Sequence, residues 1–201
     1  MEMIQESRSH EGNEFRIVIS EDGKKHLEGY GIVFNSESRL LYGFFVERVL
    51  PEAIDGADMT RIVSQFNHDR NMVLGTSWAG TLTYSIDARG VKYKVELPDT
   101  NAGRDVAILA ERGDLRASSF GFRVKDDYWT IETRDGKQIE VRTIKKFELI
   151  NDLSPVIDEA YEGTQGLDIS KRFYEERKNA ALGGTPPKES EEDKYLKLLC
   201  A

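Results

Sequence analysis

Hydrophobic and polar residues alternate along much of the chain before Asp158. A period of two is typical of β-strands that bury one face, and short turns containing glycine separate several of the runs. The clearest case is a hairpin in which 82–86 and 91–97 flank a turn at 87–90. The pattern predicts a mainly β protein, with strands in the ranges 15–19, 27–34, 44–50, 82–86, 91–97, 116–124, 128–131, 139–144 and 147–150.

The period changes after residue 99, where apolar residues take up the spacing of a helix. Val106 and Leu109 would share one helical face. Thr100 or Asn101 is suited to the N-cap, and Gly113 lies where such a helix would end. We therefore predict a helix that connects the hairpin to the strand at 116–124.

The length and composition indicate one folded domain with tails. A chain of 201 residues, of which 39% are hydrophobic, is long enough for one well-filled core. We expect a flexible N-terminus at 1–13, because it has few apolar groups, and one domain at 14–182. That domain would include a helical turn at 52–56 and a helix at 168–182. The Gly, Pro, Ser, Glu and Lys residues that dominate 183–201 are typical of a linker and tail.

The charge and the reactive side chains exclude several classes of function. The 28 Lys and Arg against 36 Asp and Glu give a net charge of −8, which disfavours binding to nucleic acid or to an anionic membrane. No signal peptide or bilayer-spanning run is present, so we expect a cytosolic, soluble protein. The single cysteine, Cys200, excludes an internal disulfide. The three histidines lack metal-site spacing, and we expect no metal and no cofactor.

Ser119 is the first candidate for chemistry, because it precedes Phe-Gly-Phe within an otherwise apolar strand. The phenylalanines can enter the core, while Gly121 lets another backbone or a substrate approach closely. One interpretation is that Ser119 is a nucleophile. The alternative is an ordinary strand, in which the hydroxyls of Ser118 and Ser119 are solvated and the glycine lies at a bulge.

His68 and Asp152 supply the other groups that acyl transfer needs. A neutral imidazole can take the proton of a serine hydroxyl, and a carboxylate can orient the ring. His68 follows Phe66-Asn67, where a strand meets a loop, and Asp152 precedes Leu153-Ser154-Pro155. The three residues are remote in sequence, so only a folded sheet can join them. Each has an alternative explanation: His68 as an ordinary core or surface histidine, and Asp152 as a solvated acid.

The ordered series of motifs resembles the prohead (capsid maturation) serine proteases of tailed bacteriophages, which are distant relatives of herpesvirus assemblin. The resemblance covers roughly residues 14–165, and the series is more specific than any single piece. The matching stretches are Glu28-Gly29-Tyr30-Gly31-Ile32-Val33-Phe34-Asn35, Glu47-Arg48-Val49-Leu50-Pro51, Phe66-Asn67-His68-Asp69, Leu74-Gly75, Gly80-Thr81-Leu82, Gly90-Val91, Glu96-Leu97-Pro98-Asp99-Thr100, Arg104-Asp105, Ser119-Phe120-Gly121-Phe122 and Asp152-Leu153-Ser154-Pro155-Val156.

The resemblance implies a role for each candidate residue. His68 would be the catalytic base, Ser119 the nucleophile and Asp152 the third member of a triad, with Glu148 close enough in sequence to compete. The oxyanion would be held by a backbone N–H near Ser119 or, by analogy with the basic group of assemblin, by Arg142. The chain departs from the family's usual residues at 52–54 and 159–161, which affects loops rather than the proposed nucleophile and base.

The implied fold is α+β and mainly β: a closed or partly closed, assemblin-like β-barrel flanked by helices. The paired glycines of the 27–34 strand agree with a strongly bent sheet. The implied function is a serine endopeptidase inside the immature capsid (prohead) in the host cytoplasm. Its partners would be the scaffolding region of the major capsid protein, other prohead proteins, itself as substrate and a second copy in a dimer. The tail after 183 would suit self-processing.

Three other functions remain open at this point. A non-catalytic capsid scaffold or interaction module would keep the fold without the activity. A ligand-binding β-barrel would be favoured if His68 and Ser119 lay far apart. A hydrolase with paired carboxylates is a more distant alternative, since none of the many acids shows the spacing that such chemistry needs.

Overall fold

The computed structural model describes residues 6–10, 15–41, 45–134 and 136–157, the first of these ranges by its backbone alone. These ranges belong to one compact unit, Met1–Tyr161. The elements are β1 (Glu6–His10), β2 (Arg16–Ile19), β3 (Lys25–Val33), β4 (Phe45–Val49), the 3₁₀ turn η1 (Pro51–Ile54), β5 (Val63–Gln65), the 3₁₀ turn η2 (Phe66–His68), β6 (Val73–Thr76), β7 (Leu82–Ile86), β8 (Gly90–Glu96), α1 (Asn101–Arg112), β9 (Ala117–Arg134) and β10 (Lys137–Val156).

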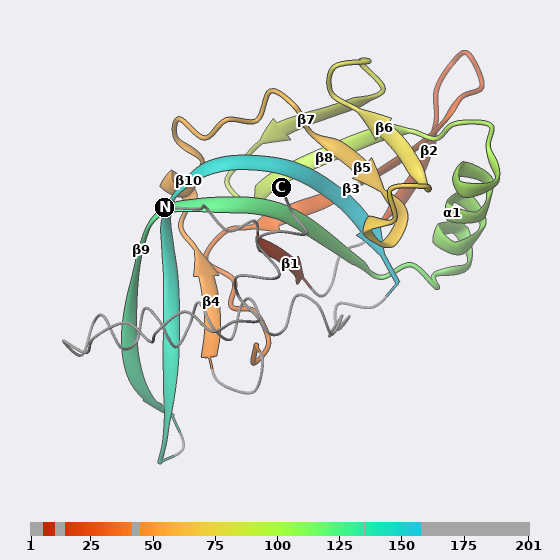
Figure 1. The fold of residues 1–201 in the computed structure, drawn as a ribbon. Coiled ribbons are helices and arrows are strands. Elements are labelled where there is room, and N and C mark those ends of the chain that lie inside the picture. Colours follow the sequence, from red (N-terminus) through yellow and green to blue (C-terminus); the bar gives the residue numbers. More distant parts are fainter. Residues whose placement is uncertain (1–5, 11–14, 42–44, 135, 158–201) are drawn as a thin grey trace, which may run out of the picture. The chain divides into compact units, whose positions relative to one another are not determined.

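The strands form two sheets (Figure 1). The first has the order β1-β9-β10-β5-β6, and β4 also pairs with β10. The second has the order β2-β3-β8-β7 and is antiparallel throughout. In the first sheet β10 pairs antiparallel with β9 but parallel with β4 and β5. The sheet that contains β9 and β10 therefore gathers segments from the beginning, middle and end of the described chain.

The core lies between the two sheets. Phe120, Phe122 and Leu153 of the first sheet are fully buried, as are Tyr93 and Val95 of the second. The sheets approach closely where glycines leave room: a Cβ on Gly31 would come within 2.5 Å of the Leu153 side chain, and one on Gly75 within 2.5 Å of Val95. Gly31, one of the two glycines in β3, is therefore a point at which the absence of a side chain lets the two sheets pack closely.

The mainly β class predicted from the sequence is confirmed, but the barrel is not. Among the described residues neither sheet closes on itself, because each ends in different edge strands: β1 and β6 in the first sheet, β2 and β7 in the second. The curvature lies instead in the long strands β9 and β10. Their pairing shows register shifts between residues 144 and 152 of β10, and irregularities of this kind bend a strand. Two layers of curved strands therefore enclose the apolar core.

The helix α1 forms where the spacing predicted it. The Thr100 side chain accepts a hydrogen bond from the Gly103 N–H at 3.3 Å, and Gly113 ends the helix in the left-handed conformation (φ 79°). Val106 is fully buried, so the predicted apolar face packs inward. No helix in the described ranges is long and apolar enough to cross a membrane.

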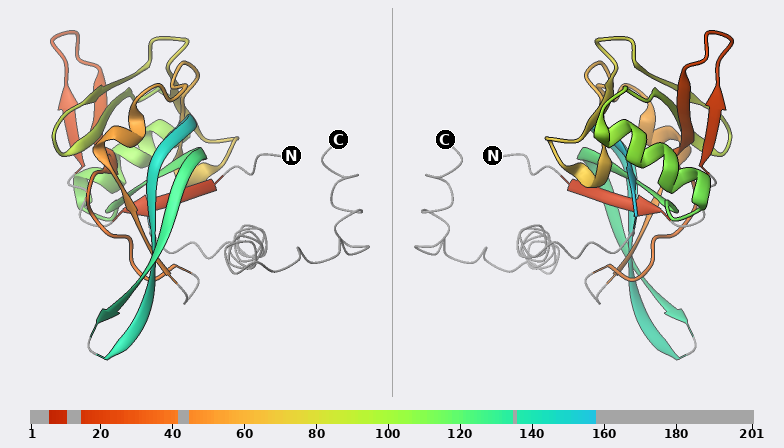
Figure 2. Two further views of the ribbon diagram at one scale, coloured as in Figure 1. Left: turned by 90° about the vertical axis from the view of Figure 1, so that its left-hand side faces the viewer. Right: turned by 90° about the vertical axis from the view of Figure 1, so that its right-hand side faces the viewer.

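The last strands of the sequence pattern join into one long hairpin. The ranges predicted separately as 116–124 and 128–131 are both part of β9, while 139–144 and 147–150 are both part of β10. Gly136 lies in the connection with a positive φ of 75°, a backbone conformation that glycine adopts without steric cost. Figure 2 shows the hairpin extending well past the rest of the described sheets.

The N-terminus departs from the expectation that 1–13 would be flexible. Residues 6–10 form β1, which pairs antiparallel with β9. A strand can be held through its main chain alone, so the scarcity of apolar side chains did not prevent pairing. The predicted helix at 168–182 and the tail at 183–201 lie outside the described residues.

Glu37 links the loop before β4 to the hairpin and gives a prediction for acid stability. Its carboxylate accepts two hydrogen bonds from the Arg134 guanidinium, at 2.6 and 2.8 Å, and another from Arg48. The hydrogen bonds from Arg134 are the main cause that lowers the pKa of Glu37 from 4.5 to about 2. Because the folded state lowers this pKa, the stabilisation is present above pH 4.5 and is lost as the pH falls towards 2.

We expect Glu37→Gln to lower the free energy of unfolding by about 1–2 kcal/mol near pH 6, a value reduced by solvent screening of the partly exposed partners. Urea unfolding of both chains at several pH values measures the difference. It should shrink steadily below pH 4.5. A difference that is constant with pH would mean that the carboxylate charge is not the source of the effect.

Candidate active site

Three neighbouring strands of the first sheet bring the predicted residues together. Ser119 lies on β9, Asp152 lies on the adjacent β10, and His68 ends the turn η2 directly after β5, the next strand across. Asp152 pairs with Gly121 of β9 on one side and with Val63 of β5 on the other. The order of the strands, rather than proximity in sequence, therefore assembles the site.

The alternation of β9 separates the two adjacent serines. Ser118 shares its face with Phe120 and Phe122 on the core side, and its hydroxyl lies 3.0 Å from the hydroxyl of Tyr93. Burial raises the pKa of Tyr93, so the pair is a neutral hydrogen bond. Ser119 faces the other way, towards His68. The strand thus presents Ser119 rather than Ser118 to an imidazole.

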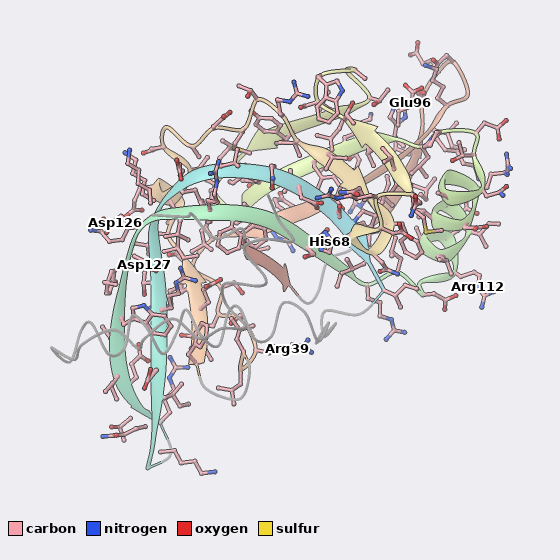
Figure 3. All side chains as sticks on the ribbon, viewed as in Figure 1. Arg39, His68, Glu96, Arg112, Asp126 and Asp127 are labelled. Carbon is pink, nitrogen blue, oxygen red and sulfur yellow. The ribbon has the colours of Figure 1, made fainter. Side chains whose placement is uncertain are left out.

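His68 is placed by an unusual backbone. Asn67 and His68 both have positive φ, 51° and 57°, a conformation that side chains other than glycine seldom adopt. The Asn67 side chain supports this turn by accepting a hydrogen bond from the Ile157 N–H at 3.0 Å. Strained backbone of this kind persists where surrounding contacts fix it, often at functional sites. Figure 3 labels His68 in relation to the strands.

The distances agree with a relay of three groups. His68 Nε2 lies 2.7 Å from Ser119 Oγ, which is hydrogen-bonding distance. On the other side of the ring, His68 Nδ1 lies 3.3 Å from Asp152 Oδ2. The acid beside the ring is therefore Asp152, the residue preferred over Glu148 in the sequence analysis. The histidine side chain is 34% exposed, whereas that of Asp152 is 11% exposed.

Gln65 holds the acid from behind and was not singled out from the sequence. Its side-chain Nε2 donates to Asp152 Oδ2 at 3.1 Å, and its backbone N–H donates to Ser154 Oγ at 2.9 Å. Ser154 in turn pairs with Ser119 across the two strands. The other carboxylate oxygen, Oδ1, is buried with no hydrogen-bond partner among the described residues. The only signal in the sequence was an amide three residues before the histidine.

Arg142 does not belong to this site. Its guanidinium is buried in the hairpin, where it donates to Asp127 at 2.7 Å and to Glu47 at 3.0 Å. The register places Arg142 opposite Trp129, ten residues along β9 from Ser119, which at about 3.3 Å per residue is a separation of tens of ångströms along the strand. Figure 3 accordingly shows Asp127 on the hairpin, far from His68. The analogy with the basic group of assemblin is wrong for this residue.

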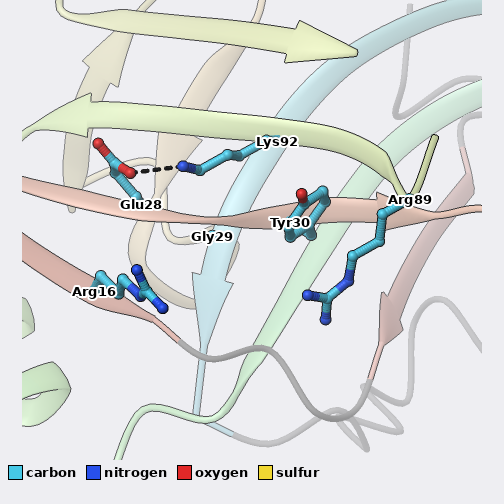
Figure 4. A pocket seen from close by; sticks show the side chains of 6 residues that line it. All are labelled: Arg16, Glu28, Gly29, Tyr30, Arg89 and Lys92. Atoms are coloured by element: carbon cyan, nitrogen blue, oxygen red, sulfur yellow. Dashed lines mark hydrogen bonds and ion pairs between the residues drawn. The ribbon is translucent and has the colours of Figure 1, made fainter. Parts of the chain in front are cut away.

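A second surface feature is a pocket on the other sheet (Figure 4). Its lining carries three basic side chains and one acid: Glu28 bonds Lys92 at 2.8 Å, and the Arg89 guanidinium lies 4.5 Å from the centre of the Tyr30 ring. The residues that line it are Arg16, Glu28, Gly29, Tyr30, Arg89 and Lys92. None of them belongs to the Ser119 site, and none of them is a serine, threonine or cysteine.

A serine, a histidine and an aspartate in this order of contact define a serine hydrolase arrangement on a two-sheet β fold. The comparisons with known proteins agree. The caudovirus prohead serine protease family matches residues 13–179, most of the chain, and the chain belongs to this family. It is a family of serine peptidases. The motif-based resemblance to the phage proteases is therefore confirmed.

Among solved structures, the comparison matches the capsid assembly protease gp21 of bacteriophage T4. The match has a TM-score of 0.46 and 13% sequence identity, and covers 76% of this chain and 96% of that chain. A search of curated proteins finds no match. The family assignment therefore rests on the family match.

Proposed function

We propose that the chain is a serine endopeptidase of prohead maturation in which Ser119 is the nucleophile, His68 the general base and Asp152 the residue that orients the base. The observation that carries the proposal is the continuous contact from Ser119 Oγ through both ring nitrogens of His68 to Asp152 Oδ2. The family of serine peptidases to which the chain belongs supports the same chemistry.

The geometry supports a two-stage reaction. His68 Nε2 takes the proton of Ser119 as Oγ bonds to the substrate carbonyl carbon. The imidazolium then gives that proton to the departing amine as the peptide C–N bond breaks, which leaves an ester on Ser119. In the second stage His68 takes a proton from a water molecule that attacks the ester, and returns it to Ser119 Oγ. Asp152 keeps Nδ1 protonated throughout, so that Nε2 is the nitrogen that accepts.

The substrates that we propose are polypeptide segments of the immature capsid: the scaffolding region of the major capsid protein, other prohead proteins and this chain itself. We also propose that the protein works as a dimer inside the prohead. A non-catalytic scaffold with the same fold would show none of the reactions below.

Covalent labelling tests the proposal. We expect a fluorophosphonate to add one adduct to the wild-type chain, and peptide mapping to place it on Ser119. The Ser118→Ala variant, which alters the adjacent hydroxyl on the core side, should label fully, whereas Ser119→Ala should not label at all. Absence of any adduct in the wild type, or an adduct retained by Ser119→Ala, would contradict the proposed nucleophile. Intact mass of the same chains after storage reports self-cleavage.

A further inference from the structure

The edge of the sheet beside Ser119 is occupied by this chain's own N-terminal strand. β9 has β10 on one side and β1 on the other, and β1 is the terminal strand of the sheet. The antiparallel register places Ser9 opposite Ser119 and His10 opposite Ser118. Paired residues in such a ladder lie about 4.5–5.5 Å apart between Cα atoms. The main chain of β1 is therefore the backbone nearest to the candidate nucleophile on that side (Figure 1).

The exposure of the site residues is the second observation. Ser119 is 1% exposed, although its hydroxyl has to reach the carbonyl carbon of a peptide. The neighbouring His68 side chain is 34% exposed. The base is open to solvent while the nucleophile is covered. Two strands pair with β9 at Ser119, and of these β10 carries Asp152. β1 carries none of the three site residues, so it is the neighbour that a substrate strand can replace.

A sheet edge that runs past a nucleophile is suited to bind an extended peptide. When a strand is added to a sheet edge, the main-chain N–H and C=O groups of both partners form hydrogen bonds. Binding of this kind therefore depends little on which side chains the added strand carries. β1 already shows that the edge at 118–122 accepts five residues in antiparallel register. A substrate segment bound in the same way would place successive peptide groups along β9 beside Ser119.

On the basis of the proposed peptidase function, we propose that the β9 edge at 118–122 is the binding site for an extended segment of substrate polypeptide. Residues 6–10 of this chain fill that site until substrate displaces them. The partner is thus defined by its chemistry: an unfolded or extended stretch of polypeptide with free main-chain hydrogen-bonding groups. The apparent affinity for substrate is therefore the intrinsic affinity multiplied by the fraction of molecules in which the edge is free.

The full-length Arg8→Pro/Ser9→Pro variant tests the proposal. Successive residues of a strand direct their N–H groups to opposite sides, so two adjacent prolines remove a donor from the ladder whichever phase it has. We expect kcat/KM for denatured casein to rise at least ~10-fold over the wild type, because the open edge becomes the main state. The control Ser7→Ala/Ser9→Ala keeps every backbone donor and should behave as the wild type.

A peptide with the sequence of residues 4–12 should inhibit the double-proline variant competitively, while the same peptide with both prolines should not. Equal or lower kcat/KM in the double-proline variant, with Ser119 fully labelled by fluorophosphonate, would overturn the inference and leave the proposed function standing. No labelling in any chain would instead overturn the function. Loss of the far-UV circular dichroism of the double-proline variant would also count against the inference, since a strand that substrate displaces cannot be essential to the fold.

Discussion

Replacing His68 with alanine is expected to lower kcat/KM for a peptide substrate by at least ~10⁴-fold while the fold is retained. Without the imidazole at 2.7 Å, no group takes the proton of Ser119 Oγ as it attacks. The free hydroxyl is a weak nucleophile at neutral pH. Because the His68 side chain is partly exposed and ends a short turn, its removal leaves no large buried cavity. Hydrolysis of denatured casein and the rate of fluorophosphonate labelling measure the effect.

The double variant His68→Ala/Ser119→Ala provides the stringent control. Members of one catalytic unit act together, so the double variant should be no slower than either single variant. The Ser118→Ala chain should retain wild-type activity, since that hydroxyl bonds Tyr93 in the core. A loss of less than tenfold in His68→Ala, with normal far-UV circular dichroism, would show that the contact between the ring and Ser119 is not used in the reaction.

Much of the site was predictable because the signals are local. Ser119 was singled out by the Phe-Gly-Phe that follows it, and the structure shows why the pattern is informative: Phe120 and Phe122 face the core and leave Ser119 on the opposite face. Asp152 was preferred over Glu148 because the resemblance to the phage proteases implies an acid two residues before the Ser154-Pro155 pair. The pairing of Asp152 with Gly121 brings the acid beside the strand that carries Ser119. The placing of Ser119 on the face opposite Phe120 and Phe122 depends on the period of a strand, which the sequence displays directly.

The parts that could not be predicted depend on which strands pair. Alternation shows that 116–124 and 139–150 are strands, but nothing in it shows that β10 lies between β9 and β5, the order that assembles the site. Nor does it show whether curved sheets close into a barrel or remain two open layers. The N-terminal strand was missed for a related reason. Main-chain pairing with β9 leaves no mark on the side-chain pattern of residues 6–10.

Arg142 was considered as an oxyanion-stabilising residue, but its contacts in the structure are those of a buried ion-pair cluster. An arginine in a predicted strand invited the analogy with an oxyanion-stabilising group. In the structure β4 runs parallel to β10 with Glu47 opposite Arg142, and Asp127 of β9 reaches the same guanidinium. The side chains of all three are at most 3% exposed. The cluster therefore joins β4 to the hairpin far from the site, with Arg142 paired to both acids.

Replacing Arg142 with methionine should accordingly destabilise the protein by about 3–5 kcal/mol, because the change removes the guanidinium that pairs with two buried carboxylates. Urea unfolding at pH 7 measures the loss, which is a large share of the ~5–15 kcal/mol typical of a folded domain. The control Lys145→Met breaks an exposed ion pair with Asp126 on the same hairpin and should change stability little. The triple variant Arg142→Met/Glu47→Leu/Asp127→Leu should recover most of the loss, since no buried charge remains unpaired. If the triple variant were no more stable than Arg142→Met, the cost would come from lost packing against Trp129, whose ring lies 5.9 Å from the guanidinium, rather than from stranded charge.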